Sequence, residues 1–518
     1  MSKRPNFILF ITDQHRGDWL GCAGHPVVKT PNIDALAGKG TRFTDFHVAT
    51  PVCMPNRASL LTGRFPSVHG LRSNGALLPR SANTFVDVLA AGGYRTASIG
   101  KSHLQPMTGV KLPRQETEAR QIEEAWKADG SDYTQEQRQA FEARGGEIET
   151  PYYGYQKVVT ASHHGPNSGG HYAKWLKEVA PNWEELLDPE QELPHSYTCP
   201  QAFRTPMPEE LYPTSFIRDQ TIAHLKEAAQ QEEPFFLFVS FPDPHHPFNP
   251  PGKYWDMYDP DAFDVPLPYD AHRNPIPPLQ YLKGELDAGN PPPTPQSAFM
   301  AGKRHVQEAM ALTAGMITMV DDAIGEVMEQ MRALDLDRET VVMFTSDHGD
   351  YMGDFNLLLK GSPPFRSITK VPFIWHDPVD PTSRETAQMG STVDISATIL
   401  DRAGFAPYNG IQGRSLLSAI RGGRGPRDHL FCEFNDVVPR LGFEAPPMVR
   451  SVLTPTHRLT VYLGEDWGEL YDLSADPGET CNLWDDPAHA EEKAQLVLRL
   501  THDLIDQMDR SPAVTQLA

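Results

Sequence analysis

Four stretches of apolar residues in this chain are each followed at once by polar side chains. They cover residues 6–12, 96–100, 234–241 and 340–346. Apolar runs without polar alternation are typical of strands that are buried on both faces of a parallel sheet. Segments with helical signals precede or separate these runs, at residues 30–40, 84–91, 215–230 and 297–333. The alternation predicts an α/β fold with a doubly wound, mostly parallel sheet flanked by helices.

The last hundred residues follow a different pattern. Short strands at hairpin spacing are predicted at residues 449–453, 457–463 and 468–473, and a final helix at 488–509. We therefore expect a large domain over residues 1–420 and a small domain over 421–518, made of an antiparallel sheet and a covering helix.

Two segments of the large domain lack sustained periodicity. Residues 106–215 are rich in Gln, Glu, Pro, Tyr and Gly, and we interpret them as an insertion folded over the core, with a helix near 114–128. The Pro-rich segment 242–296 is expected to be an ordered loop that could act as a lid.

The polar residues at the ends of the apolar runs are expected to meet at one place. They are Asp13 and Gln14, Lys101 and His103, His245 and His246, and Asp347 and His348. In open parallel sheets, ligands bind beyond the carboxyl ends of the strands. One polar strand end is ordinary, but four of them indicate a single site at one edge of the sheet.

Composition excludes some classes of partner. The 518 residues carry 46 basic and 68 acidic side chains, a net charge of −22. Proteins that bind nucleic acids or anionic membranes need a basic face, so we expect neither partner. An anionic substrate is not excluded, because a few lysines, arginines or a metal ion can dominate the field inside a cleft.

The first apolar run is too short to cross a bilayer and no cleavage site follows it, so we expect no membrane span and no export signal. The 5 cysteines are scattered, at positions 22, 53, 199, 432 and 481. They show no Cys-x-x-Cys spacing, which argues against a disulfide scaffold and a structural zinc site. A cytoplasmic location is the simplest expectation.

One cysteine stands out by its position. Cys53 lies just before a short segment, 57–61, that is predicted to be helical and to end at Gly63. The positive end of the helix dipole would stabilise a thiolate there, or an oxyanion on a group that replaces it. The alternative for a lone cysteine is a buried side chain that packs a turn.

The motif Cys53-x-Pro55-x-Arg57, followed by Leu-Thr-Gly63-Arg64, resembles the signature of the type I sulfatases, which belong to the alkaline phosphatase superfamily. The resemblance implies that a maturase oxidises Cys53 to formylglycine, which then acts as the nucleophile and forms a covalent sulfo-enzyme intermediate. It also implies that Arg57 holds either the formylglycine hydroxyl or the metal-binding carboxylates.

The resemblance extends to a metal site. Asp13-Gln14 after the first strand and Asp347-His348 after a late strand are similar to the family's metal sequence, to which residue 53 also contributes. Taken alone, Asp347 could equally cap the next helix. Many members carry Asp-Asp and Asp-Asn and bind calcium. Because Gln14 and His348 lower the ligand charge and add nitrogen, manganese, magnesium or zinc is favoured over calcium. The pair resembles the choline-sulfatase and phosphonate monoester hydrolase branch.

The resemblance also implies a cradle for an anion. Lys101 and Asn74 match residues that bind substrate oxygens, and His103 matches the residue that contacts the second hydroxyl of the nucleophile. His245 and Lys360 match the pair that hydrogen-bonds the leaving-group oxygen, with His246 behind them. We expect His245 to protonate that oxygen as it departs, with Lys360 as the alternative donor. Lys-Ser-His at 101–103 is more similar to an arylsulfatase than to a phosphonate monoester hydrolase. The metal sequence and this segment therefore point to different substrates.

Three functions follow from these features. The first is a hydrolase of sulfate monoesters that is promiscuous toward phosphodiesters and phosphonate monoesters. The second uses the same site mainly on phosphodiesters or phosphonate monoesters, and the third is a non-catalytic metal-binding protein with unconverted Cys53. The expected partners are a small anionic ester and the maturase. The oligomeric state is left open, with a homo-oligomer as one option.

Overall fold

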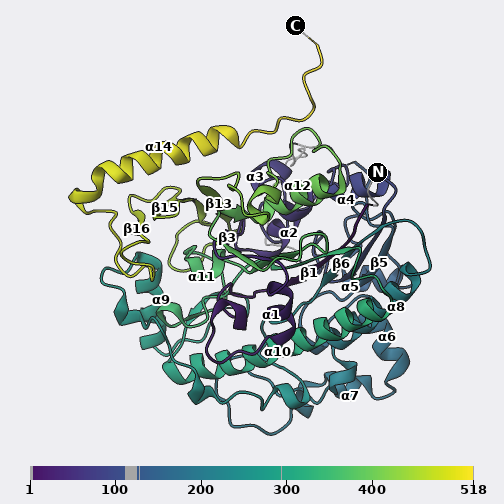
Figure 1. Cartoon of the computed structure of the whole chain (residues 1–518). Helices are drawn as coiled ribbons and strands as arrows, with labels where there is room; N and C mark the ends of the chain where they lie inside the picture. Colours follow the sequence, from purple (N-terminus) through teal and green to yellow (C-terminus); the bar gives the residue numbers. More distant parts are fainter. Residues whose placement is uncertain (1–3, 111–124, 126, 128, 293, 517–518) are drawn as a thin grey trace.

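The chain is built on a central sheet, of which Figure 1 labels strands β1, β6 and β5. Eight strands form this sheet, in the order β11-β2-β10-β8-β1-β6-β4-β5. The computed structural model describes residues 4–110, 125, 127, 129–292 and 294–516. Five neighbouring strands, β8 to β5, run parallel, and β10 is antiparallel to both of its neighbours. The strands are β1 (Asn6–Thr12), β2 (Thr41–Phe43), β4 (Arg95–Gly100), β5 (Lys157–Thr160), β6 (Phe235–Ser240), β8 (Thr340–Ser346), β10 (Phe373–His376) and β11 (Arg384–Thr386). The predicted α/β fold with a doubly wound, mostly parallel sheet is confirmed.

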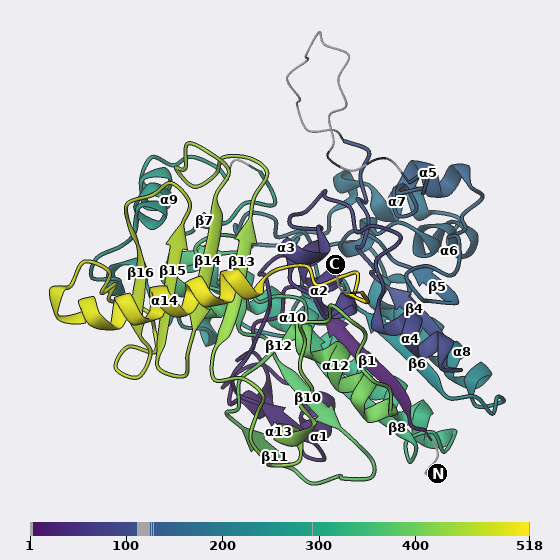
Figure 2. The ribbon, with the colours of Figure 1, turned by 90° about the horizontal axis from the view of Figure 1, so that it is seen from above.

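Side chains of β1 alternate between two cores, one on each face of the sheet. Phe7, Leu9 and Ile11 pack into one core, whereas Ile8 and Phe10 pack into the other. Helices α2, α4 and α12 cover the first face, and α1, α8 and α10 cover the second (Figure 2). Their bounds are α1 (Pro31–Ala37), α2 (Cys53–Thr62), α4 (Phe85–Ala91), α8 (Pro213–Ala228), α10 (Lys303–Ala333) and α12 (Thr392–Ala403). Because both faces are covered, the central strands are apolar throughout.

The long helix begins later than the sequence predicts. It was expected from residue 297, but α10 begins at Lys303, after Gly302 in an extended conformation. The preceding residues Phe299–Met300 form the short strand β7, which pairs with β9 (Leu357–Leu358). These two residues therefore bond to a distant segment instead of extending the helix.

The segment 106–215 does more than cover the core. Its strand β5 pairs in parallel with β4 and forms an edge of the main sheet. Its helices are α5 (Arg138–Ala143), α6 (His171–Val179) and α7 (Trp183–Leu187). The helix predicted near 114–128 falls almost entirely on residues 111–124, 126 and 128, outside the described residues. The interpretation as a covering insertion was incomplete, because β5 also brings its own loop to the edge of the sheet where the other strands end.

The Pro-rich segment 242–296 contains a helix that the sequence analysis missed, α9 (Pro277–Asp287). Three short 3-10 turns precede it, at Gly252–Tyr254, Pro260–Ala262 and Tyr269–Ala271. Ile276, Leu279 and Leu282 pack in one cluster with Leu430 and Tyr471 of the C-terminal sheet. The segment is thus a packed connection between the two parts of the chain, and its role as a lid stays a prediction.

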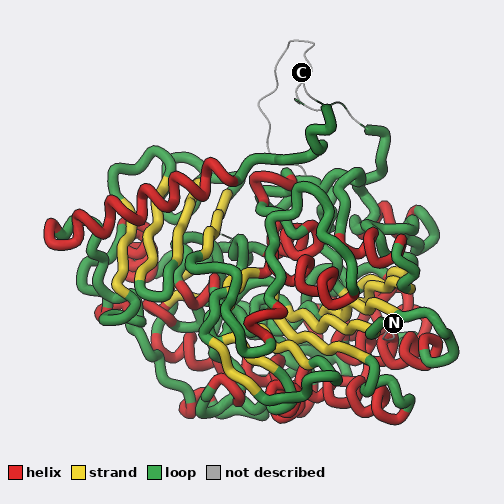
Figure 3. Tube along the Cα trace, turned by 45° about the horizontal axis from the view of Figure 1, so that its top comes forward, coloured by secondary structure: helices red, strands yellow, loops and turns green. Residues whose placement is uncertain are grey.

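The C-terminal part forms a separate four-stranded antiparallel sheet (Figure 3). Its strands are β13 (Leu430–Asn435), β14 (Met448–Leu453), β15 (His457–Tyr462) and β16 (Gly468–Asp472), and helix α14 (Ala490–Asp506) lies across it. The sequence predicted the last three strands and the helix but not β13. The remaining short strands and α-helices of the described residues are β3 (Phe46–His47), α3 (Pro66–His69), α11 (Arg366–Thr369), β12 (Gly390–Ser391) and α13 (Leu417–Ile420). Among the described residues, every helix is too short or too polar to cross a bilayer.

Candidate active site

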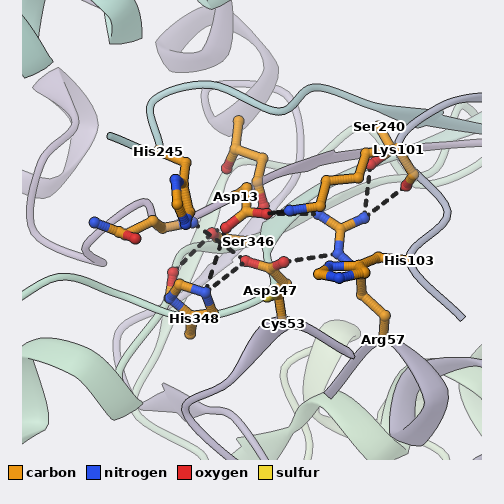
Figure 4. Close-up of polar contacts among 12 residues, drawn as sticks. Asp13, Cys53, Arg57, Lys101, His103, Ser240, His245, Ser346, Asp347 and His348 are labelled. Carbon is orange, nitrogen blue, oxygen red and sulfur yellow. Dashed lines mark hydrogen bonds and ion pairs between the residues drawn. The ribbon is translucent and has the colours of Figure 1, made fainter. Parts of the chain in front are cut away.

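Polar side chains from the carboxyl ends of four parallel strands converge at one edge of the main sheet. Asp13 follows β1, Lys101 follows β4, His245 follows β6 and Asp347 follows β8, and all four are at most 1% exposed. Helix α2 brings two further residues, Cys53 and Arg57, to the same place. Figure 4 shows this group together with His103 and His348.

Three of these side chains form a cluster that could hold a metal ion. Ligand atoms of Asp13, Asp347 and His348 all lie within 4.8 Å of one another. Nε2 of His348 is 3.3 Å from Oδ1 of Asp13 and 3.5 Å from Oδ1 of Asp347. Nδ1 of His348 is 2.8 Å from the carbonyl oxygen of Gly349 and donates to it, which leaves Nε2 directed at the carboxylates. Oδ1 of Asp13 has no hydrogen-bond donor among the described residues.

Gln14 is suited to supply a neutral oxygen ligand. It is 1% exposed and has a left-handed backbone with φ 66°, which turns the chain sharply after β1. Its amide nitrogen donates to Asp350, while its buried Oε1 has no hydrogen-bond partner among the described residues. Such an orphaned oxygen fits a metal ligand. The predicted metal set also included Cys53, which the structure does not bring into the group within 4.8 Å.

The electrostatics of the cluster favour an added positive charge. Burial raises the pKa of Asp13, but Lys101, Lys360 and the nearby His348 hold it well below its usual value. Burial and Lys360 lower the pKa of His348, whereas Asp347, Asp13 and Cys53 raise it to about 9. Two buried carboxylates thus hold a proton on an imidazole, at a place where a divalent cation would satisfy them better.

Arg57 ties the helix of Cys53 to the cluster. Its Nε lies 2.7 Å from Oδ2 of Asp347 and its Nη2 lies 3.5 Å from Oδ2 of Asp13. Its Nη1 donates to the carbonyl oxygen of Lys101 and to Oγ of Ser240, both at 2.8 Å. Of the two roles that the resemblance left for Arg57, these contacts match the one that holds the carboxylates.

Cys53 is the first residue of α2, which begins four residues before the helix that the sequence predicted. The helix ends at Gly63, whose φ of 61° is left-handed and suits glycine. Cys53 is 2% exposed, and its Sγ atom lies 3.6 Å from Nδ2 of Asn74. Burial raises the pKa of the Cys53 thiol, yet Lys360, His103 and Lys101 lower it well below its usual value. The site therefore stabilises negative charge at residue 53.

Two lysines from different parts of the chain contact the cluster: Lys101 follows β4, and Lys360 follows β9. Nζ of Lys101, which is fully buried, donates to Oδ2 of Asp13 and lies 3.2 Å from Nε2 of His164. Nζ of Lys360 lies 3.0 Å from Nε2 of His348 and 3.9 Å from Oδ1 of Asp13. Both ammonium groups also lower the pKa of the Cys53 thiol, so they can act as a cradle for an anion at that residue.

His245 lies between two other imidazoles. Its ring is stacked on that of His164, with centroids 3.4 Å apart, and on that of His246, with centroids 3.9 Å apart. Its Nδ1 lies 2.5 Å from the carbonyl oxygen of His246 and donates to it. Burial, and then His164 and His246, lower the pKa of His245 well below its usual value. His245 is thus neutral in this state, with Nε2 as an acceptor.

The sequence analysis missed two residues of this site, both in the segment 106–215. His164 follows β5, so the rule of polar strand ends would have found it had this segment been assigned to the sheet. Glu136 is 4% exposed and accepts hydrogen bonds from the backbone N–H groups of His103, Leu104 and Gln105, at 2.8, 2.9 and 3.2 Å. No local pattern marks it, because its partners lie about thirty residues away.

Fold and site together define an alkaline-phosphatase-like α/β class, in which buried carboxylates, a cysteine at a helix start and two lysines share one edge of a parallel sheet. The sulfatase family model matches residues 5–405. The chain therefore belongs to the sulfatase family and is an enzyme of that family, as the resemblance predicted. A second model, described as the C-terminal part of N-sulphoglucosamine sulphohydrolase, matches residues 365–506.

Known relatives cover nearly the whole chain. It is 26% identical over 530 residues to an arylsulfatase of Clostridium perfringens, covering 98% of this chain and 95% of the relative. It is 28% identical over 548 residues to a multifunctional alkaline phosphatase superfamily protein of Trinickia caryophylli, covering 96% of each. The crystal structure of the phosphonate monoester hydrolase of Agrobacterium radiobacter superposes with a TM-score of 0.78 at 24% identity, covering 99% and 98% of the two chains. This last likeness shows a shared fold.

Proposed function

We propose that this protein hydrolyses sulfate monoesters, as an arylsulfatase-like enzyme with formylglycine at residue 53 and one divalent metal ion. The observation that carries the proposal is the environment of Cys53. Although the residue is 2% exposed, Lys360, His103 and Lys101 lower the pKa of its thiol well below the usual value. A buried position that favours negative charge, inside a cradle of ammonium groups, suits the transfer of an anionic group. Membership of the sulfatase family supports sulfate as that group.

The proposed reaction needs two groups that the sequence does not encode, a metal ion and formylglycine. Asp13, Gln14, Asp347 and His348 would hold the metal ion, which supplies Lewis acidity beside residue 53 when it is bound. Nitrogen from His348 and the neutral amide of Gln14 favour manganese, magnesium or zinc over calcium. Formylglycine, made from Cys53 by a maturase, supplies a hydrated aldehyde in place of a thiol. The orphaned Oδ1 of Asp13 and Oε1 of Gln14 are the observations that fit a metal.

The other residues would act on the transferred group and on protons. Lys101, Lys360 and the amide of Asn74 would take up charge on the oxygens of the sulfate group. His103 is half-buried and close enough to Cys53 to lower its pKa, so it can hold the proton of a hydroxyl at that position. The deep burial of the cluster excludes bulk water and strengthens each of these interactions.

Lys360 is the better candidate for the proton donor to the leaving oxygen. The sequence analysis expected His245 to protonate the leaving oxygen and left Lys360 as the alternative donor. His245 donates through Nδ1 to the carbonyl oxygen of His246, and its lowered pKa leaves Nε2 without a proton. It therefore accepts a hydrogen bond from the site, whereas the Lys360 ammonium presents donors only.

Phosphodiesters and phosphonate monoesters form the second candidate class of substrate. The Gln14 and His348 pair favours them, and one relative is described as multifunctional. The lysine cradle accepts any tetrahedral anionic centre with free oxygens, so it does not separate the two classes.

A side-by-side assay separates the two classes. We expect kcat/KM for a nitrophenyl sulfate to exceed that for bis-nitrophenyl phosphate and for a nitrophenyl phenylphosphonate, with one enzyme preparation and one metal. A higher kcat/KM for either phosphorus ester would make the second candidate the native function.

A further prediction concerns Glu136, which holds the loop of His103. A carboxylate accepts three backbone N–H groups there and the hydroxyl of Tyr152 at 2.6 Å. Glu136→Gln would turn an NH2 group toward these donors, so we expect kcat/KM for a nitrophenyl sulfate to fall about tenfold. Glu142→Gln, an exposed site in the same segment, is the control. Unchanged kcat/KM in Glu136→Gln would show that His103 keeps its place without this carboxylate.

A further inference from the structure

We propose that His164 is a positioning residue that fixes both the Lys101 ammonium and the ring of His245 for the reaction. The inference rests on the proposed function of the site, in which Lys101 contacts the transferred group. The signature motif and the metal set do not include His164. Its side chain nevertheless touches two residues that face the substrate.

The contact with Lys101 defines the state of the His164 ring. An ammonium group has three donors and no acceptor, so Nε2 of His164, 3.2 Å away, must be the acceptor. The proton of the neutral ring is therefore on Nδ1. Asp13 accepts a second N–H of the same ammonium. Two of the three protons of Lys101 are thus directed by the protein, which leaves one for an oxygen of the substrate.

The contact with His245 fixes a ring plane. The planes of His164 and His245 are 10° apart, and those of His245 and His246 are 29° apart. His245 is consequently covered on both faces. Together with the bond from its Nδ1 to a carbonyl oxygen, this arrangement prevents rotation of the ring and keeps Nε2 directed at the site.

The two contacts depend on each other through charge. Two cationic imidazoles cannot stack at a centroid distance of 3.4 Å in a buried site, because their repulsion is poorly screened. The hydrogen bond from Lys101 keeps His164 neutral, so it can lie flat against His245. Burial, and then Lys101, accordingly lower the pKa of His164 well below its usual value.

A role in packing alone does not account for this side chain. Nδ1 of His164 is covered from solvent and has no hydrogen-bond partner among the described residues. Leaving a buried N–H unpaired is unfavourable. An apolar ring would fill the same space without that cost, but it could not accept the bond from Lys101.

Two substitutions separate the two contacts. His164→Gln keeps an oxygen that can accept from Lys101 but removes the stacked ring. His164→Phe keeps a ring against His245 but removes the acceptor. The control is His163→Asn, since this half-buried neighbour has a left-handed φ of 67°, which asparagine tolerates.

Each contact has its own readout in the fully matured, metal-loaded enzyme. The inhibition constant of inorganic sulfate reports on Lys101, and the slope of log kcat/KM against leaving-group pKa for a series of aryl sulfates reports on the leaving-group side of the site. We expect His164→Phe to raise the inhibition constant about tenfold with an unchanged slope. His164→Gln should keep the inhibition constant within about threefold of the wild-type value and alter the slope. His163→Asn should change neither.

Two outcomes would overturn the proposal. One is that both variants shift both readouts in parallel, as expected for a general loss of structure. The other is that neither readout changes. If His164→Phe does not fold, judged by thermal unfolding, His164→Tyr replaces it. If the wild-type enzyme prefers phosphodiesters, the same readouts are taken with aryl phosphodiesters and inorganic phosphate. The proposed function then fails while the role of His164 is still tested.

Discussion

Cys53→Ser abolishes turnover while the protein still folds and binds inorganic sulfate; this is the largest effect that we expect. Serine keeps a hydroxyl near Asn74 and the lysines, so the cradle for the anion is preserved. It does not provide the hydrated aldehyde, whose second hydroxyl releases the transferred group, so kcat should fall by more than about 10⁴-fold. Peptide mass spectrometry of the wild-type protein, made with a maturase, should show formylglycine at residue 53.

The matched control is Cys22→Ser. Cys22 is half-buried and lies outside the site, and burial and Asp34 raise the pKa of its thiol to about 12. Its replacement should leave kcat/KM unchanged. Finding only free cysteine at residue 53 in fully active enzyme would refute the assignment of the nucleophile.

Removal of the metal should have the second largest effect. Because Asp13, Gln14, Asp347 and His348 join oxygen and nitrogen donors, we expect a chelator to lower activity by more than about 10³-fold and manganese to restore it better than calcium. Asp347→Asn should weaken manganese binding about 10- to 100-fold, measured by calorimetry without substrate. Asp18→Asn, which changes an exposed carboxylate in the loop after β1, is the control. Stoichiometric calcium in fully active protein would contradict the preference.

The pH dependence of metal binding has a definite sign. The pKa of about 9 for His348 means that the metal-free site holds a proton at pH 7, and the metal must displace it. Apparent affinity should therefore rise with pH, by up to about tenfold for each unit, and level off above the pKa. An affinity independent of pH between 6 and 8 would show that the metal displaces no proton from His348.

Cytoplasmic location, the maturase partner and the oligomeric state stay predictions. They concern the surroundings of the chain and not its fold. The burial of Cys53, which is 2% exposed, bears on when a maturase could reach it. We expect modification to precede folding, which a comparison of maturation during synthesis and after refolding would test.

The strand ends of the site were accessible from sequence alone. Asp13, Lys101, His245 and Asp347 each follow a run of apolar residues, and strands buried on both faces leave such runs in any sequence. Parallel strands also end at one edge of the sheet. These two rules predict which residues meet without knowledge of the order of the strands. The motif around Cys53 is equally local, since five of its defining positions lie within one helix and its end.

Only the tertiary structure showed His164, Glu136 and the role of Arg57. Lys157–Thr160 is a short edge strand with alternating burial, so it gave no continuous apolar run and its loop was not assigned to the site. Glu136 acts on backbone groups of another loop, and the backbone carries no sequence signal. The sequence analysis missed α9 and β13, two elements that contribute to one hydrophobic cluster although they lie far apart in the sequence. Leu279 and Leu282 of α9 and Leu430 of β13 are members of this cluster.

There is a physical reason why the sequence predicted some features of this protein and only the tertiary structure showed others. Periodic burial and chain reversals are properties of consecutive residues, and they determined the fold class and the main members of the site. Contacts such as His164 with Lys101 join residues 63 positions apart, and they depend on which strands become neighbours and how their loops pack. That choice is made by the free energy of the whole core, and no short stretch of the sequence contains it.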